Sequence, residues 1–268
     1  MQRRALLSAT LLAATAGLAA ALPARAAEPA IARIKATGTL RVGLSTFVPW
    51  SFPDKNGQLV GFEIDVATRL ARELGVKLEV VPTAWDAIIP SLIAGKYDVV
   101  IGGLTVTPER ARTVDFTLPY EHSQIYAVVN TKLAPAITAP AQLDSPAVTL
   151  ALRRGSTAAS LNAFPRAHTN YFDDENTQTQ EFVNGNATAV LVSTPSPALL
   201  AEEHPTLVRI LEPPVRQTDE AMAIRKGDPQ TREVLDAWIK SRTDDGWLKE
   251  RFDYWFKGRA WKGLIAAD

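Results

Sequence analysis

The chain has 268 residues, of which 46% are hydrophobic, with 29 basic and 29 acidic side chains and no cysteine. This neutral balance excludes the strongly basic footprint of a nucleic-acid-binding protein or of a protein that adheres to anionic membranes. The absence of cysteine excludes a disulfide framework and thiolate chemistry, so packing alone must stabilise the fold.

The first 26 residues have the form of a secretory signal peptide. Arg3 and Arg4 precede an apolar run over residues 5–22, and Ala24-Arg25-Ala26 has the small-x-small form of a cleavage site. The paired arginines leave both the general and the twin-arginine export route open. We therefore expect a periplasmic protein cleaved near Ala26. Its roughly 240 residues suffice for one large or two medium domains.

The mature chain opens with alternating strands and helices. Short apolar runs predict strands, and apolar residues at helical spacing predict helices closed by Gly75 and Gly95. The expected strands cover residues 40–44, 76–81 and 97–101, and the expected helices cover 62–74 and 85–93. This β-α-β-α-β order predicts a parallel sheet with helices on its faces.

The same order recurs further along the chain. Strands are expected over residues 147–152, 169–172 and 188–192, and helices over 156–163, over 175–184 and from Pro195. Extended segments at 124–130 and 221–225 bracket this unit, and two helices, 231–242 and 246–256, follow it.

We therefore expect an α/β fold with two lobes joined by a two-stranded hinge. Lobe 1 would comprise residues 27–129 and 217–268, and lobe 2 would be inserted as residues 130–216. In open α/β sheets ligands bind beyond the carboxyl ends of the strands, so the cleft between the lobes is the expected site. Such clefts close by hinge bending.

Residues 94–120 carry the clearest local motif. The strand expected over 97–101 ends in Gly102-Gly103, where backbone can approach a ligand closely. Thr105 offers a hydroxyl, and Thr107 and Pro108 have the pattern of a helix N-cap and first turn. Arg110 follows. Glycines, hydroxyls, a helix start and an arginine together favour a carboxylate-binding site.

Four segments in this order resemble the family 3 solute-binding proteins, the periplasmic amino-acid receptors of ABC importers. They are Gly61-Phe62-Glu63-Ile64-Asp65-Val66-Ala67, residues 94–120, Arg154-Gly155-Ser156-Thr157, and the tail with Asp245-Gly246-Trp247 and Tyr254-Trp255-Phe256. The resemblance implies a type II periplasmic-binding-protein fold. It also implies a monomeric receptor for a small carboxylated ligand that partners ABC permease subunits, with no cofactor, metal or nucleic acid.

The resemblance also implies roles for individual residues. Arg110 would bind the ligand α-carboxylate through both arms of its guanidinium, with Thr105 and the Gly103 backbone beside it. Ser156 and Thr157 would meet the same carboxylate from lobe 2, through hydroxyls and a helix N-terminus. Phe47 and Trp85 would form the aromatic walls, with Trp50 in the core. The alternative for Arg110 is an exposed arginine paired with Glu109 or Asp115.

The pattern departs from the family at Ser193. Receptors of this type carry an aspartate there that pairs with the ligand ammonium, and a buried ammonium without such a partner costs several kcal/mol. Glu121 and His122 could reach into the cleft and supply the missing charge, or they could be solvated loop residues, and Asp219 is a third candidate. Otherwise the ligand is not a standard α-amino acid but a keto acid, a dicarboxylate or another small carboxylate, an option that Arg153 beside Arg154 favours.

The runner-up function is a periplasmic enzyme resembling cyclohexadienyl dehydratase, which needs a desolvated general acid in the cleft. Glu121 is the acid best placed for that role. Glu63 and Asp65 are two residues apart on a helix and do not face each other, which indicates a structural role. The three histidines lack the spacing of a zinc site. We therefore expect no catalytic residue.

Overall fold

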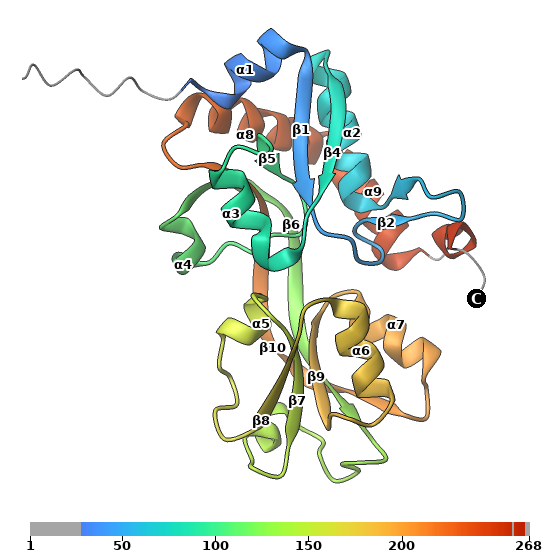
Figure 1. The fold of residues 1–268 in the computed structure, drawn as a ribbon. Helices are drawn as coiled ribbons and strands as arrows, with labels where there is room; N and C mark the ends of the chain where they lie inside the picture. The colour runs from blue at the N-terminus through green and yellow to red at the C-terminus, as the bar shows by residue number, and fades with distance from the viewer. Residues whose placement is uncertain (1–27, 259, 266–268) are drawn as a thin grey trace, which may run out of the picture.

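Two long antiparallel strands, β6 (Val114–Asn130) and β10 (Val208–Arg225), run from one α/β lobe into the other in the computed structural model (Figure 1). The structure describes residues 28–258 and 260–265, so the expected signal peptide lies outside it. These strands are the predicted hinge. They extend well beyond the expected segments 124–130 and 221–225.

Lobe 1 contains a parallel arrangement of β1 (Thr39–Leu44), β4 (Lys77–Pro82) and β5 (Val99–Val100), and β10 continues its sheet. A small hairpin pairs β2 (Phe52–Pro53) with β3 (Leu59–Val60). The helices of this lobe are α1 (Ala30–Thr37), α2 (Phe62–Leu74), η1 (Trp85–Ala87), α3 (Ile88–Ile93), α4 (Pro108–Ala111), α8 (Pro229–Asp244) and α9 (Trp247–Phe252). The tail helix expected over 246–256 is not continuous. It passes from α9 into a π-helical turn, Asp253–Lys257, and η4 (Ala260–Leu264) follows.

Helix α2 shows how the sequence sets these boundaries. Phe62, Val66 and Leu70 are fully buried on one face, as their spacing predicts. Gly75 ends the helix in the left-handed conformation with a φ of 70°. At the other end Gly61 has a φ of 136°, and a Cβ there would lie 2.3 Å from the carbonyl oxygen of Trp50. Only glycine fits that position.

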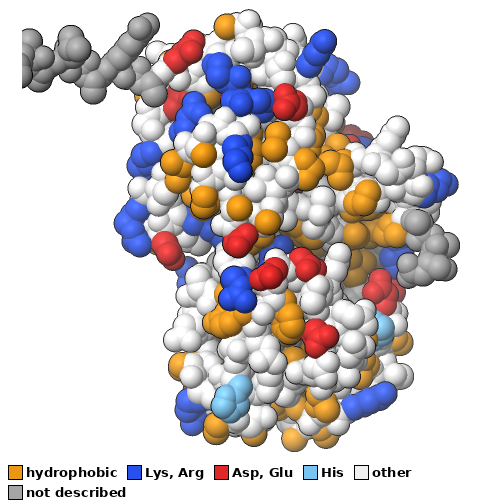
Figure 2. Space-filling model, viewed as in Figure 1, with side chains coloured by type: hydrophobic (Ala, Val, Ile, Leu, Met, Phe, Trp, Pro, Cys, Tyr) orange, Lys and Arg blue, Asp and Glu red, His pale blue; other side chains and the backbone are white. Residues whose placement is uncertain are grey.

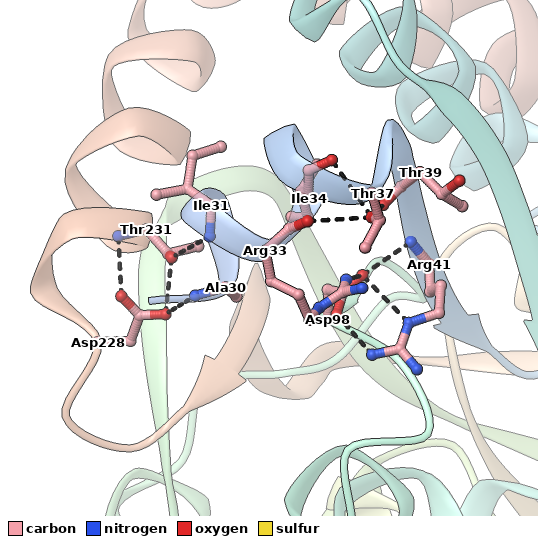
Figure 3. A network of polar contacts seen from close by, with 10 residues as sticks. All are labelled: Ala30, Ile31, Arg33, Ile34, Thr37, Thr39, Arg41, Asp98, Asp228 and Thr231. Atoms are coloured by element: carbon pink, nitrogen blue, oxygen red, sulfur yellow. Dashed lines mark hydrogen bonds and ion pairs between the residues drawn. The ribbon is translucent and has the colours of Figure 1, made fainter. Parts of the chain in front are cut away.

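The far end of lobe 1 is held by a polar network that joins α1 to the sheet and to α8 (Figure 3). Buried Asp98 accepts a hydrogen bond from the Arg41 guanidinium at 2.8 Å and forms an ion pair with Arg33. Asp228 caps α8 and also accepts the Ala30 N–H at 2.7 Å. The N-terminal helix is thereby fixed on the side of lobe 1 remote from the hinge.

Lobe 2 repeats the pattern with β7 (Thr149–Arg153), β8 (His168–Phe172) and β9 (Ala189–Ser193), in the spatial order β6-β9-β7-β8. Its helices are η2 (Pro140–Leu143), α5 (Thr157–Ser160), α6 (Glu175–Val183) and α7 (Ser196–Glu203). The predicted β-α-β-α-β order is confirmed in both lobes. Helix α5 is only four residues long, shorter than the helix expected over 156–163.

Each of the two hinge strands contributes hydrophobic side chains to the core of both lobes. On β6, Tyr120 belongs to the core of lobe 1, whereas Ile125 belongs to that of lobe 2. On β10, Leu211 packs in lobe 2 and Met222 in lobe 1. On β6, the side chains therefore begin to pack in the core of lobe 2 at Ile125. This is four residues before residue 129, where the sequence placed the end of the first part of lobe 1.

Candidate ligand-binding site

A cavity lies between the lobes at the ends of their strands. Seven of the predicted site residues line it together: Phe47, Trp85, Gly103, Thr105, Ser156, Thr157 and Ser193. Arg153, which the sequence suggested as a partner for an additional anionic group, also lines it, together with Trp50, Glu175, Gln178 and Glu220, which the sequence did not single out for binding. On the face shown in Figure 2, charged side chains of both signs gather where the two lobes meet.

The wall on the lobe 1 side is aromatic. Phe47 and Trp85 meet edge to face with ring centroids 6.3 Å apart, and Trp50 lies 5.7 Å from Phe47. Trp50 is buried, as expected of a core residue, yet it also lines the cavity. Gly103 has a φ of 63°, and a Cβ there would lie 3.3 Å from the Trp50 ring. Glycine is needed at this position both for its conformation and for the close approach of the rings.

Arg110 lies beside the cavity and not in its lining. Thr107 caps the short helix α4 and accepts the Arg110 N–H, as the motif predicts. The guanidinium then spans the cleft: Nη1 donates to the Thr105 carbonyl at 2.9 Å and to Thr157 Oγ1 at 3.3 Å, and Nη2 donates to the Gly155 carbonyl at 3.1 Å. Burial lowers the pKa of Arg110 to about 10. Asp115, the alternative partner, instead pairs with Lys226 at 3.1 Å.

Thr105 directs its hydroxyl to an acid, Glu220. Thr105 Oγ1 donates to Glu220 Oε1 at 3.1 Å, and Thr218 donates to the same oxygen at 3.0 Å. Glu220 is only 3% exposed, and burial raises its pKa to about 7. The hydroxyl expected to meet a ligand carboxylate therefore holds a carboxylate of the protein.

The lobe 2 side presents hydroxyl groups from two elements, α5 and β9. Ser156 caps α5 by accepting the Ala159 N–H at 3.1 Å, and Thr157 contacts Arg110 across the cleft. Because α5 has only four residues, its N-terminus contributes little to anion binding, and the hydroxyls remain the relevant groups. Ser193 ends β9 and faces the same cavity.

Arg153, at the end of β7, extends from lobe 2 into the aromatic wall of lobe 1. Its guanidinium lies 4.2 Å from the centroid of the Trp85 ring and 5.1 Å from that of Phe47. Glu175 Oε2 lies 3.6 Å from Arg153 Nη1 and is the ion-pair partner. Burial lowers the pKa of Arg153. The sequence indicated a basic group here, since Arg153 follows an expected strand whose end faces the cleft.

The acids expected to compensate for Ser193 do not face the cavity. His122 and Asp219 form a pair at 2.7 Å on the hinge, where their side chains are 77% and 57% exposed. Glu121 is 8% exposed and burial raises its pKa to about 9, but it is not among the lining residues. His122 and Asp219 are therefore solvated, the alternative that the sequence left open for His122, and the acid that lines the cavity from this part of the hinge is Glu220.

Glu63 and Asp65 have structural partners. The Tyr120 hydroxyl donates to Glu63 at 2.9 Å and accepts the Gly103 N–H at 3.4 Å. Glu63 and Tyr120 thereby hold the backbone at Gly103 in place. Asp65 accepts from Trp255 Nε1 at 2.7 Å. Within residues 28–258 and 260–265, no group of three or more potential metal-ligating side chains comes together.

A two-lobed α/β fold with a polar and aromatic cavity at its hinge is the architecture of a periplasmic binding protein. Residues 28–258 match the bacterial extracellular solute-binding proteins, family 3, and the chain belongs to this family. An extracellular family agrees with the expected location outside the cytoplasm.

Relatives include both receptors and an enzyme. The L-cystine-binding protein TcyJ of Escherichia coli K12 is 29% identical over 255 residues, 95% of each chain. The cyclohexadienyl dehydratase of Pseudomonas aeruginosa is 26% identical over 245 residues, 90% of this chain and 91% of its own. The ancestral amino acid-binding protein AncCDT-1, described as a precursor of cyclohexadienyl dehydratase, has a similar structure. Its TM-score is 0.78 and its identity 38%, over 85% of this chain and all of its own.

Proposed function

We propose that the protein is a monomeric periplasmic receptor of an ABC importer. It binds an amino acid or a related small carboxylate between the lobes and delivers it to the membrane permease. The observation that carries this proposal is the cleft itself, where Arg110 of lobe 1 reaches Gly155 and Thr157 of lobe 2 beside a cavity lined by both lobes.

The carboxylate is assigned to the region between Arg110 and Thr157. A guanidinium already turned toward a hydroxyl of the other lobe can exchange these neutral acceptors for an anion, with stronger, charge-assisted hydrogen bonds. The Gly103 backbone and the Ser156 hydroxyl line the adjacent cavity, within the same cleft. Phe47 and Trp85 then face the rest of the ligand.

Hinge closure is supported by contacts that exist only while the lobes are together. Trp85 Nε1 donates to the Gly155 carbonyl at 3.1 Å, and Lys262 of the tail pairs with Glu202 of α7 at 2.8 Å. A ligand held by groups of both lobes would add to these contacts and shift the population toward the closed form.

The direct test is calorimetric titration of the mature protein with the twenty L-amino acids, L-cystine and their 2-oxo analogues. Micromolar or tighter binding of one of them supports the receptor function, and small-angle X-ray scattering should show a smaller radius of gyration with that compound. If no member of the panel binds, the proposal fails. Tight binding of an ordinary amino acid would also overturn the hypothesis that Ser193 marks a different ligand class.

The dehydratase remains a second candidate because one relative is such an enzyme and because the cavity contains a buried acid with a raised pKa, Glu220. Glu121, the acid expected for this role, does not line the cavity. The assay is incubation of the protein with prephenate, followed by detection of phenylpyruvate above the uncatalysed rate. Turnover abolished by Glu220→Gln would establish the enzyme, and no turnover leaves the receptor.

A further inference from the structure

One carboxylate oxygen of Glu220, a residue that lines the cavity, has no hydrogen-bond partner among the described residues. The Thr105 and Thr218 hydroxyls both donate hydrogen bonds to Glu220 Oε1. Oε2 is buried and has no hydrogen-bond partner among the described residues. Buried polar atoms in folded proteins are nearly always hydrogen-bonded, and one left unpaired costs about 1–3 kcal/mol, so an unpaired oxygen at a cavity points to something that binds there.

The two arginines nearest the cavity are engaged elsewhere. Arg110 donates to Thr105, Gly155 and Thr157. Arg153 stacks on Trp85 and pairs with Glu175 through Nη1, while its Nε has no hydrogen-bond partner among the described residues. Both lie close enough to favour the ionised form of Glu220, but neither donates to Oε2.

We propose that Glu220 binds the positively charged nitrogen of the ligand and takes the role that Ser193 cannot fill. The ligand class is then a compound with a carboxylate and an ammonium or protonated amine close together, as in an α-amino acid. This inference rests on the proposed receptor function and deepens it.

Thr105 connects the two halves of this recognition. Its carbonyl accepts from Arg110, which faces the ligand carboxylate, and its hydroxyl donates to Glu220, which faces the ligand nitrogen. One residue therefore sets the spacing between a cation and an acid. Thr105 and Glu220 also form a β-bridge, so the backbone holds them together. The raised pKa of Glu220 agrees with an acid whose cationic partner has not yet bound.

The test compares Glu220→Gln with Glu121→Gln. Glu121 stands opposite Glu220 in the hinge and is also buried, but it does not line the cavity. The probes are the tightest-binding L-amino acid of the panel above and its deamino analogue, in which hydrogen replaces the amino group. Glu220→Gln should weaken the amino acid by about 30-fold or more and the deamino analogue by less than about threefold, because only the former loses a charged partner. Glu121→Gln should bind both as the wild type does.

Several results would overturn the inference. Wild-type protein that binds the deamino analogue as tightly as the amino acid would show that no acid recognises the nitrogen. Unchanged amino-acid binding by Glu220→Gln would exclude this residue while leaving the receptor function intact. Failure of the wild type to bind any panel member defeats the receptor function and the inference with it. Thermal unfolding checks that each variant is folded, and Glu220→Asp, which keeps the charge, should recover part of the lost affinity.

Discussion

The Arg153 guanidinium lies 4.2 Å from the centroid of the Trp85 ring, although Arg153 ends a strand of lobe 2 and Trp85 begins a helix of lobe 1. A cation of the protein thus occupies the aromatic part of the cavity, where it also lies 5.1 Å from the centroid of the Phe47 ring. A ligand whose side chain is also cationic would meet like charge there, whereas an anionic or neutral one would not. A ligand in this cavity would therefore meet a side chain of the second lobe within the aromatic wall of the first.

Arg153→Ala should let cationic ligands into this compartment. Without the guanidinium, Glu175 loses its partner and the two rings are free to stack on a ligand cation, an interaction of about 0.5–2 kcal/mol. We expect L-arginine to bind about tenfold more tightly or better, measured by calorimetry. Arg154→Ala is the matched control, since Arg154 is largely exposed and pairs with Asp173. Equal L-arginine affinities in the wild type and Arg153→Ala would show that Arg153 does not select ligands.

Arg110 is predicted to bind the ligand carboxylate through its fork of N–H donors. Arg110→Lys keeps the charge but loses the fork, and Arg110→Ala loses both. We expect affinity to fall by about tenfold for lysine and by about 100-fold for alanine, since a charge-assisted hydrogen bond contributes about 1.5–3 kcal/mol. Arg112→Ala, two residues on and exposed, should bind as the wild type does. If Arg110→Ala bound the ligand with wild-type affinity, Arg110 would not be the residue that binds the ligand carboxylate.

Trp85→Phe tests one of the hydrogen bonds that join the two lobes. The substitution keeps an aromatic wall but removes the Nε1 donor to the Gly155 carbonyl. Since one such hydrogen bond contributes about 0.5–1.5 kcal/mol, ligand affinity should fall by about three- to tenfold. Small-angle scattering of the free variant should show a larger radius of gyration. Trp238→Phe removes an indole donor to Glu73 within lobe 1 and should change neither measurement. A response equal in both variants would argue against closure through Trp85.

The local structure around Arg110 could be predicted because its signals are local. The pattern from Gly102 to Arg110 specifies a strand end, a glycine with positive φ and an N-capped turn, and all of them occur. The alternation of strands and helices was equally readable in both lobes, since each element carries its own periodicity.

The sequence did not reveal that Glu220, and not Glu121, lines the cavity, because the answer depends on how the two hinge strands pair. Glu121 and His122 on β6 pair with Glu220 and Asp219 on β10, and one residue decides which side chain faces the cavity. The pairing shifts at Glu220 and Ala221, where an irregularity breaks the simple alternation. Nothing in the local sequence marks this shift. The orientation of Arg153 relative to Arg154 at the end of β7 depends on tertiary packing in the same way.

The buried acid Glu63 predicts how stability depends on pH. Burial raises its pKa from 4.5 to about 8, against the opposing effect of the Tyr120 hydrogen bond. Between these values the folded protein binds more protons than the unfolded chain, so this group makes the free energy of unfolding fall as pH rises from about 4.5 to about 8.

Glu63→Gln keeps an acceptor for Tyr120 but cannot ionise. Its loss of Tm between pH 5 and pH 9 should be smaller than that of the wild type by about 5 °C or more, measured by calorimetry or circular dichroism. Glu73→Gln is the contrasting variant: the pKa of Glu73 is lowered from 4.5, so its contribution has the opposite sign and changes only below about pH 4.5, and the variant should follow the wild type between pH 5 and pH 9. Parallel pH profiles for the wild type and Glu63→Gln would mean that Glu63 does not titrate in this range in the folded protein.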